Sequence, residues 1–299
     1  MLLCFDIGGS RIKAALATAP SQMQVLGDAP TPLNDFSAFT AVLAGFLQPG
    51  LRGIAISLAG CVDPADGRLK CANIPCIDGR GLAQDLFSIL RLPVWILNDA
   101  DCFALAEATS GAGAGHRTVF GVILGTGVGG GLVIDGAVIA GAGGFSGEWG
   151  HGPVLNAHPL GISLPRMVCP CGQTGCVDTI GGARGMERLH LALHGHRVTS
   201  ETLLADWQAG DATAAQTVTV WLDLVADVLA TVLNVIGATI VPVGGGLSNV
   251  APLVDALDLA VRARVLRRDS GPVLRRAAHQ VEPGLIGAAQ AGWRGLAHV

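Results

Sequence analysis

Hydrophobic runs of strand length alternate with glycine-rich turns at two places in the chain. Near the middle, an apolar run from Val119 gives way to Gly125-Thr126-Gly127-Val128-Gly129-Gly130-Gly131, and a second apolar run then extends to Asp135. Near the start, apolar residues 2–5 precede the polar turn Asp6–Arg11, and Ile12–Ala17 forms a second apolar stretch. Both patterns predict a strand, a turn with few side chains and a returning strand. A repeat at about half the chain length indicates a duplicated domain.

The remaining periodic segments predict alternating helices and strands, and therefore an α/β fold. Helical spacing covers 36–47, 82–90, 100–109, 185–194, 200–208, 212–236, 250–266 and 287–296, and short apolar runs predict strands at 24–26, 52–57, 93–97 and 239–243. The long apolar tract 222–243 contains Asp223, Asp227, Asn234 and Pro242, so we interpret it as a buried helix followed by a strand and not as a membrane span.

A glycine-rich linker at 111–115 indicates two domains. We expect an N-terminal α/β domain at 1–116 and a C-terminal α/β domain at 117–299. The final helix, at about 285–297, is expected to pack back on the N-terminal domain.

Composition narrows the class of protein. The net charge of −4 and the pI near 6.0 give no basic surface, so we expect no nucleic-acid partner. The first residues have no signal-peptide pattern, and we expect a cytoplasmic protein without membrane association. Eight cysteines in a chain of 299 residues do not indicate a disulfide framework.

The glycine turns are candidate phosphate sites, because no Cβ keeps an anion away from their backbone N–H groups. A single such turn is equally well explained as a flexible surface loop, and the second copy favours phosphate binding. Only the first turn carries an acid, Asp6, which makes it a candidate partner of Mg²⁺ beside a phosphate. A third turn, Gly244–Gly246, lies between a predicted strand and a predicted helix and can approach a nucleotide base or ribose.

Polar residues follow the predicted strand 93–97 at its carboxyl end, where open α/β sheets bind ligands. Asn98 or Asp99 could simply cap the following helix. A cap needs one such residue, however, and Asn98, Asp99 and Asp101 all crowd this junction. The sequence therefore favours a functional carboxylate here.

A third group of residues has the composition of a zinc site. His151 precedes Cys169, Cys171 and Cys176, and a Cys₃His set suits tetrahedral Zn²⁺. The alternative is a set of free or redox thiols with an unrelated surface histidine. Clustered thiols in a cytoplasmic protein favour a structural metal.

The motifs together resemble those of the ROK family (repressors, open reading frames, sugar kinases) over nearly the whole chain. They are, in order, Asp6-x-Gly-Gly-Ser, Asn98-Asp99, Leu124-Gly-Thr-Gly-Val-Gly-Gly-Gly, Glu148-x-Gly-His151, Cys-x-Cys-Gly-x-x-Gly-Cys-x-Asp178 and Gly244-Gly-Gly-Leu-Ser. The resemblance implies an actin-like (ribonuclease H-like) duplicated two-domain sugar kinase fold with an interdomain cleft. It also implies ATP with Mg²⁺, structural Zn²⁺, a homodimer formed through the second domain, and transfer of the γ-phosphoryl group to a hexose.

Carried over position by position, the resemblance makes Asp99 the general base for the sugar 6-hydroxyl. It implies a sugar site formed by Gly60, Asn73, Asn98, Asp99, Glu148, His151 and Asp178, and a metal site formed by His151, Cys169, Cys171 and Cys176. The implied nucleotide site contains Asp6, Gly8, Gly9, Ser10, Arg11, Lys13, Gly125, Thr126, Gly127, Gly245 and Gly246. Four positions depart from the family pattern. Ser10 replaces Thr, Arg11 replaces Lys, Ala59 precedes Gly60 where Pro is frequent, and Asp178 replaces Glu.

The long segment Gly152–Val168, with three prolines, most resembles the N-acetylglucosamine kinases of the family. We therefore expect conversion of N-acetyl-D-glucosamine to its 6-phosphate. A glucokinase, a fructokinase and an N-acetylmannosamine kinase are alternatives, because Asp178 shortens an expected glutamate by one methylene. A catalytically silent sugar-binding protein and a repressor are alternatives of another class. Asp99 and the two phosphate turns argue against the first, and the five residues before Asp6 leave no room for the DNA-binding domain of the second.

Overall fold

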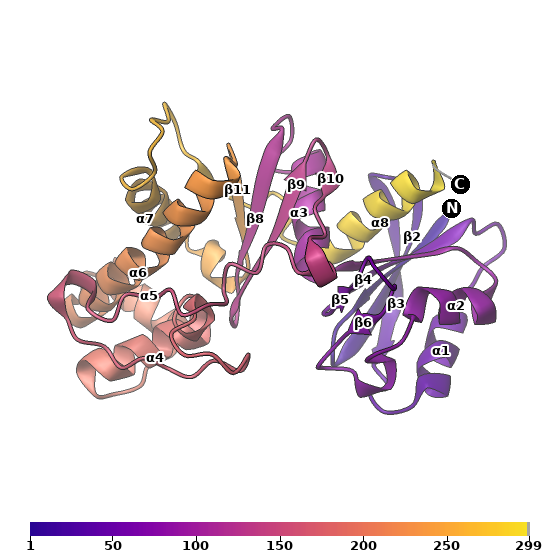
Figure 1. Cartoon of the computed structure of the whole chain (residues 1–299), viewed down its shortest axis with the longest axis horizontal. Helices are drawn as coiled ribbons and strands as arrows, with labels where there is room; N and C mark the ends of the chain where they lie inside the picture. The colour runs from indigo at the N-terminus through magenta and orange to yellow at the C-terminus, as the bar shows by residue number, and fades with distance from the viewer. Residues whose placement is uncertain (298–299) are drawn as a thin grey trace. The chain divides into compact units, whose positions relative to one another are not determined.

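The computed structural model describes residues 1–297, which form two compact units (Figure 1). Unit 1 contains residues 1–115, 131–146 and the described chain from His279 onward, and unit 2 contains residues 116–130 and 147–278. This division differs from the predicted domains chiefly because residues 131–146 belong to unit 1; in addition, His116 belongs to unit 2 and the chain returns to unit 1 at His279. The reason for the first difference is close packing: a Cβ on Gly131 would lie 2.7 Å from Ala100 O, and a Cβ on Gly144 would lie 2.3 Å from Val62 O.

Unit 1 is built on a five-stranded sheet of order β3-β2-β1-β4-β7, in which β2 is antiparallel to β1, and β4 and β7 run parallel to it. Its elements are β1 (Leu2–Ile7), β2 (Arg11–Ala19), β3 (Gln22–Pro30), α1 (Phe36–Ala44), β4 (Gly53–Leu58), β5 (Cys61–Val62), β6 (Leu69–Lys70), α2 (Leu82–Leu90), β7 (Val94–Asn98), α3 (Asp99–Ser110), β10 (Ala137–Val138) and α8 (Pro283–Leu296).

Alternation along β1 divides the core of unit 1 between the two faces of the sheet. Leu3 and Phe5 pack into a cluster with residues of α1 and α2, whereas Leu2 and Cys4 pack into a second cluster with residues of α3 and α8. Figure 1 shows α8 in yellow beside the strands of this sheet. The last helix of the chain therefore completes the core that the first strand begins.

Unit 2 contains the other glycine turns and four helices. Its elements are β8 (Thr118–Leu124), β9 (Val128–Ile134), α4 (Ala183–His194), α5 (Ser200–Gln208), α6 (Ala212–Ile236), β11 (Val241–Gly244), α7 (Ala251–Arg262) and β12 (Leu274–Arg276). The strand order of the second sheet is β10-β9-β8-β11-β12, with β11 parallel to both β8 and β12. Strand β9 begins in unit 2 and ends in unit 1.

Helix α6 is the one described helix that is long and apolar enough to cross a membrane by length and composition. It packs against α4, α5 and α7, and its Trp221, Leu224 and Leu229 are fully buried. These contacts make α6 the core helix of unit 2.

The structure confirms the predicted α/β class, and several elements, including β3, α7 and α8, differ from their predicted bounds. Strand β3 spans Gln22–Pro30 instead of 24–26, because it pairs with nearly the whole length of β2. Helix α7 ends at Arg262, four residues before the predicted end. Helix α8 begins at Pro283 and not at 287, since proline is tolerated in the first turn of a helix.

Candidate functional site

The first glycine turn joins β1 to β2 and is held closed by the end of β3. Gly8 N donates to Arg11 O at 3.0 Å. Thr31 braces the turn twice, since its hydroxyl donates to Gly8 O at 2.7 Å and its amide donates to Ser10 O at 3.1 Å. Asn73 lies beside the turn, because a Cβ on Gly9 would approach its Cβ to 3.5 Å. The turn is thus a fixed cradle, and Thr31 is a contributor that the sequence did not reveal.

Asp6 lies at the end of β1, where its carboxylate is largely enclosed. Ser57 Oγ donates to Asp6 Oδ1 at 2.7 Å, and a Cβ on Gly284 of α8 would lie 2.5 Å from the same oxygen. Burial raises the pKa of Asp6, and the hydrogen bond from Ser57 and the charge of Lys13 lower it in part. A buried carboxylate gains most from a nearby cation, so the surroundings of Asp6 fit Mg²⁺.

The two cations beside the first turn are paired with acids of unit 1. Arg11 forms an ion pair with Asp28, and Lys13 Nζ lies 2.8 Å from Glu282 Oε1. The hydrogen bond to Glu282 raises the pKa of Lys13, so the lysine stays charged. Exposed ion pairs of this kind contribute about 0–1 kcal/mol and can be exchanged for a bound phosphate.

Asn98 and Asp99 lie where β7 ends and α3 begins. Asn98 Oδ1 accepts from Ala100 N at 2.9 Å, and its Nδ2 donates to Gly60 O at 3.2 Å. Asp99 Oδ1 also lies 2.9 Å from Ala100 N. Gly60, Asn98 and Asp99 are therefore brought together, and Asn98 serves as the helix cap.

The second glycine turn is held by the start of α4. Gly125 N donates to Gly127 O at 3.0 Å, which closes the turn. The first two amides of α4 then donate to carbonyls of the turn. Ala183 N donates to Gly125 O at 2.8 Å, and Arg184 N donates to Thr126 O at 3.3 Å. The helix amides are a second contribution that the sequence did not reveal.

The third glycine turn packs directly on the second. Gly245 has a φ of 84°, and a Cβ there would lie 2.4 Å from the carbonyl carbon of Leu124. Only glycine both adopts this positive φ without strain and lacks the Cβ that would collide with Leu124. Two of the implied nucleotide-binding segments are consequently neighbours within unit 2.

The structure brings the four predicted zinc ligands together, with one ligand atom from each within 4.8 Å of the others. Cys169 Sγ lies 3.7 Å from His151 Nδ1, and Cys171 Sγ lies 3.6 Å from Cys176 Sγ. The other ring nitrogen of the histidine, Nε2, lies 3.7 Å from Glu148 Oε2. Three thiols and one imidazole are the donor set of a closed structural zinc site, so these residues fit Zn²⁺.

The thiols of this cluster differ in acidity. A hydrogen bond from the backbone of Gln173 lowers the pKa of the Cys171 thiol to about 7, whereas burial raises the pKa of Cys169 to about 12. Cys171 therefore ionises before Cys169, and a cation would favour the thiolate of both.

Asp178 and Trp149 contact the hairpin that carries the second glycine turn. Asp178 Oδ1 accepts from Val128 N at 2.9 Å, and Trp149 Nε1 donates to Gly129 O at 2.9 Å. The sequence offered no signal for either contact, because the partners lie 50 and 20 residues apart in the chain.

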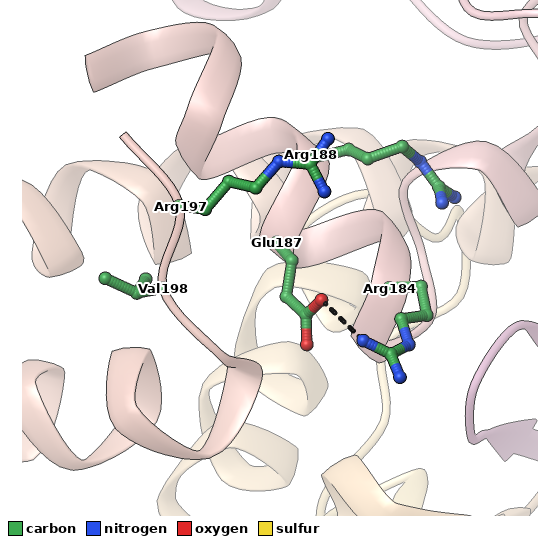
Figure 2. A pocket seen from close by; sticks show the side chains of 5 residues that line it. All are labelled: Arg184, Glu187, Arg188, Arg197 and Val198. Atoms are coloured by element: carbon green, nitrogen blue, oxygen red, sulfur yellow. Dashed lines mark hydrogen bonds and ion pairs between the residues drawn. The ribbon is translucent and has the colours of Figure 1, made fainter. Parts of the chain in front are cut away.

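A pocket of about 230 Å³ borders α4 and the loop before α5 (Figure 2). Glu187 pairs with Arg184 at 3.2 Å and accepts from Ser200 N at 3.2 Å, which joins α4 to the start of α5. Arg188 donates twice to Thr179 O, at 3.1 and 2.8 Å, and so anchors the residue that follows Asp178.

Comparison with known proteins identifies relatives over the whole chain. The ROK family model matches residues 2–292. The N-acetylgalactosamine kinase AgaK of Shewanella sp. (strain ANA-3) is 36% identical over 293 residues, which cover 96% of this chain and 95% of the relative. An N-acetyl-D-glucosamine kinase of Salmonella typhimurium (strain LT2) is 34% identical, covering 95% and 97%. The crystal structure of the ROK hexokinase from Thermus thermophilus superposes with a TM-score of 0.85 at 27% identity, covering 100% of this chain and 99% of that one.

Proposed function

The chain belongs to the ROK family, and we propose that it is a cytoplasmic kinase that transfers the γ-phosphoryl group of ATP to the 6-hydroxyl of an N-acetylhexosamine. The observation that supports this substrate class most directly is that both relatives are named as kinases of 2-acetamido sugars. N-acetyl-D-glucosamine remains the first candidate, with N-acetyl-D-galactosamine as its alternative because the AgaK relative is named for that sugar.

In the proposed reaction, unit 1 supplies the acceptor for the proton. Asp99 takes the proton of the sugar 6-hydroxyl as that oxygen forms its bond to the γ-phosphorus, and the bond from phosphorus to the β-phosphate oxygen breaks to release ADP. Asn98, held by Gly60 O and by the amide of Ala100, fixes the backbone that carries Asp99. Gly60, Asn73 and Asn98 would contact the sugar on this side.

The residues that we propose for nucleotide binding come from both units. Gly8, Gly9 and Ser10 of unit 1, with Arg11 and Lys13 behind them, would bind phosphates, and Asp6 would hold Mg²⁺, which offsets phosphate charge during transfer. Gly125, Thr126 and Gly127 of unit 2 would bind the remaining phosphates, and Gly245 and Gly246 would lie against the adenosine. The adjacency of these two unit 2 turns supports that assignment.

Unit 2 also supplies the remaining sugar contacts. Glu148 and His151 would bind ring hydroxyls, since their side chains lie together and the His151 ring is anchored at its Nδ1 side by the cysteine cluster. Zinc bound there would fix the orientation of the imidazole.

We also propose a homodimer formed through unit 2. The support is a group of exposed apolar side chains on and next to α6 and α7, namely Val235 (80% exposed), Leu259 (63%) and Leu266 (90%). Light scattering after size exclusion tests this part, and a monomer at micromolar concentration would overturn it.

A sugar panel tests the proposed reaction. ADP release is measured by a coupled assay with N-acetylglucosamine, N-acetylgalactosamine, N-acetylmannosamine, glucose and fructose, and phosphorus NMR locates the new ester. We expect the highest kcat/KM with a 2-acetamido sugar and a 6-phosphate product. Glucose or fructose exceeding every 2-acetamido sugar by about tenfold, a difference of about 1.4 kcal/mol, would overturn the substrate assignment. ADP release without any sugar phosphate would overturn the function.

A further inference from the structure

The carboxyl end of α4 carries a cluster of three histidines that has no part in the proposed reaction. His190 and His194 lie one turn apart on the helix, and His196 follows in the loop. The ring centroid of His190 lies 4.6 Å from that of His194 and 4.8 Å from that of His196. Gly195, with a φ of 78°, turns the chain so that His196 faces His190. Neutral imidazole is the commonest metal ligand among side chains, so the position of each ring hydrogen matters.

Thr217 of α6 fixes the position of the hydrogen on His190. The Thr217 hydroxyl contacts three groups, namely Thr213 O at 3.1 Å, His190 Nδ1 at 2.9 Å and His194 Nε2 at 3.2 Å. Because a hydroxyl has one hydrogen and a carbonyl oxygen can only accept, the hydroxyl donates to Thr213 O and accepts from both rings. Burial lowers the pKa of His190, and the neighbouring His194 and His196 lower it further, so the ring is neutral. His190 therefore carries its hydrogen on Nδ1 and a lone pair on Nε2.

The Nε2 lone pair of His190 faces the Nε2 of His196 at 3.2 Å. His196 Nδ1 lies 3.3 Å from His194 O, so the neutral His196 ring also carries its hydrogen on Nδ1. A hydrogen on His196 Nε2 would fill the gap between the rings, but His194 O would then lose this donor. Two nitrogens bound to one tetrahedral Zn²⁺, each at about 2.0–2.1 Å, are about 3.3 Å apart. The spacing of the two Nε2 atoms therefore fits a shared metal ion.

The surroundings favour a positive charge between these two nitrogens. They lie at the carboxyl end of α4, which is the negative end of the helix dipole. Asp206 of α5 and Asp211, the N-cap of α6, also act on His190 in the direction that favours a positive charge. His190 is 2% exposed, whereas His196 is exposed. An ion here would be enclosed by protein on one side and open to water on the other.

We propose that His190 and His196 form a metal site distinct from the cysteine cluster, which binds Zn²⁺ through their Nε2 atoms and completes its coordination with water. Imidazole suits Zn²⁺ and its neighbours among the transition metals, whereas Mg²⁺ and Ca²⁺ prefer oxygen ligands. Thr217 positions His190 by accepting its Nδ1 hydrogen, as the partners of ligating histidines commonly do. The ion ties the loop after α4 to the helix and, through Thr217, to α6. This site does not depend on the proposed kinase reaction.

Zinc titration of the full chain tests the site. The protein is loaded with zinc at the cysteine cluster and dialysed against rising Zn²⁺ at about pH 7.5, one unit above the usual pKa of imidazole. Elemental analysis counts the ions per chain, and we expect a second ion. His196→Ala should keep the first ion and bind the second at least about tenfold more weakly, since loss of an outer partner alone costs about 10–100-fold. His158→Ala removes an exposed histidine of the same unit and should keep both ions.

Thr217→Val tests the positioning role, because valine has a similar shape and cannot accept a hydrogen bond. We expect the affinity for the second ion to fall by about 10–100-fold. Thr219→Val is the matched control, since the Thr219 hydroxyl also donates to a carbonyl of α6, Ala215 O, but on the exposed side of the helix. Thermal unfolding shows whether each variant folds. If the buried Thr217→Val does not fold, the exposed His196→Ala still decides the result.

Nitrogen NMR of protein labelled at histidine distinguishes a bound ion from a shared hydrogen. Zn²⁺ should shift the Nε2 signals of His190 and His196 and leave the hydrogen on His190 Nδ1. The proposal would be overturned if the folded parent bound no second ion, if His196→Ala bound it as tightly as the parent, or if binding left both Nε2 signals unchanged. None of these measurements uses catalysis, so an absence of sugar phosphorylation would contradict the proposed function alone.

Discussion

Replacement of Asp99 by asparagine separates a catalytic carboxylate from a helix cap. The carbonyl oxygen of an asparagine occupies the place of Asp99 Oδ1 and can still accept from Ala100 N, which Asn98 Oδ1 also satisfies at 2.9 Å. The cap is therefore preserved. What is lost at the start of α3 is one negative charge near the positive end of the helix dipole, worth about 0.3–1 kcal/mol.

The expected effects on stability and turnover consequently differ in size. A loss of 1 kcal/mol lowers the Tm of a protein of this size by only about 2–4 °C. A side chain that assists proton transfer contributes about 10²–10⁴-fold to the rate, and an amide cannot take the proton. We expect Asp99→Asn to fold and to bind sugar within about threefold of the unsubstituted protein, while kcat falls by at least about 10²-fold.

Asp35→Asn is the matched control for this substitution. Asp35 caps α1 of the same unit, and its Oδ1 accepts from Ser37 N at 2.8 Å and Ala38 N at 3.1 Å. The control should lose a similar amount of stability and no activity. Calorimetric sugar binding, thermal unfolding and the coupled ADP assay are measured on both variants. A kcat for Asp99→Asn within about fivefold of normal, well inside the range expected for a general base, would refute the catalytic assignment and leave Asp99 as a capping residue.

Two further substitutions test the metal sites. Cys171→Ser should lose the bound zinc, which amounts to about one ion per chain for a Cys₃His site. Cys76→Ser is the control and should retain the zinc, because the Cys76 thiol contacts Pro32 O and lies outside the cluster. Active protein that contains no zinc by elemental analysis would contradict this prediction. Asp6→Asn should unfold at a higher temperature at pH 7 and lose Mg²⁺-dependent turnover. Because the pKa of Asp6 is raised on folding, its contribution to stability is fully present below the pKa of the unfolded chain and is lost as the pH rises through the folded pKa. The advantage of the asparagine should therefore shrink as the pH falls toward 4, and a variant less stable than the parent at pH 7 would show that the carboxylate is not penalised by burial.

The elements of the fold could be predicted because their signals are local. Alternation along β1 places Leu3 and Leu2 on opposite faces, and the spacing of Phe39 and Leu43 on α1 predicts one buried helical face. The assignment of residues 131–146 to a unit could not be predicted in this way. It depends on the absence of a Cβ at Gly131 and Gly144, which matters only once α3 and Val62 are in place.

In the candidate site, too, some features could be predicted from local sequence and others depend on the fold. The spacing of Cys169, Cys171 and Cys176 is short enough that one loop must bring the thiols together, and His151 joins them from 18 residues upstream. The partner of Asp178 is 50 residues away, and no pattern in the cysteine loop 169–176 specifies which amide its carboxylate meets. Residue type therefore predicts that a group can bind, and the fold decides what it binds.

The return of α8 to unit 1 has a consequence for how the protein is made. Leu285, Ala288 and Ala289 of α8 pack on Leu2 and Cys4 of the first strand. The ribosome releases α8 only after the residues of unit 2, so one face of the first sheet stays uncovered while unit 2 is being made. Unit 2, whose residues end at Ala278, can assemble earlier. Although chains usually fold from their N-terminus as they emerge, unit 2 can be completed before unit 1, and the first sheet is the surface that a chaperone would have to shield.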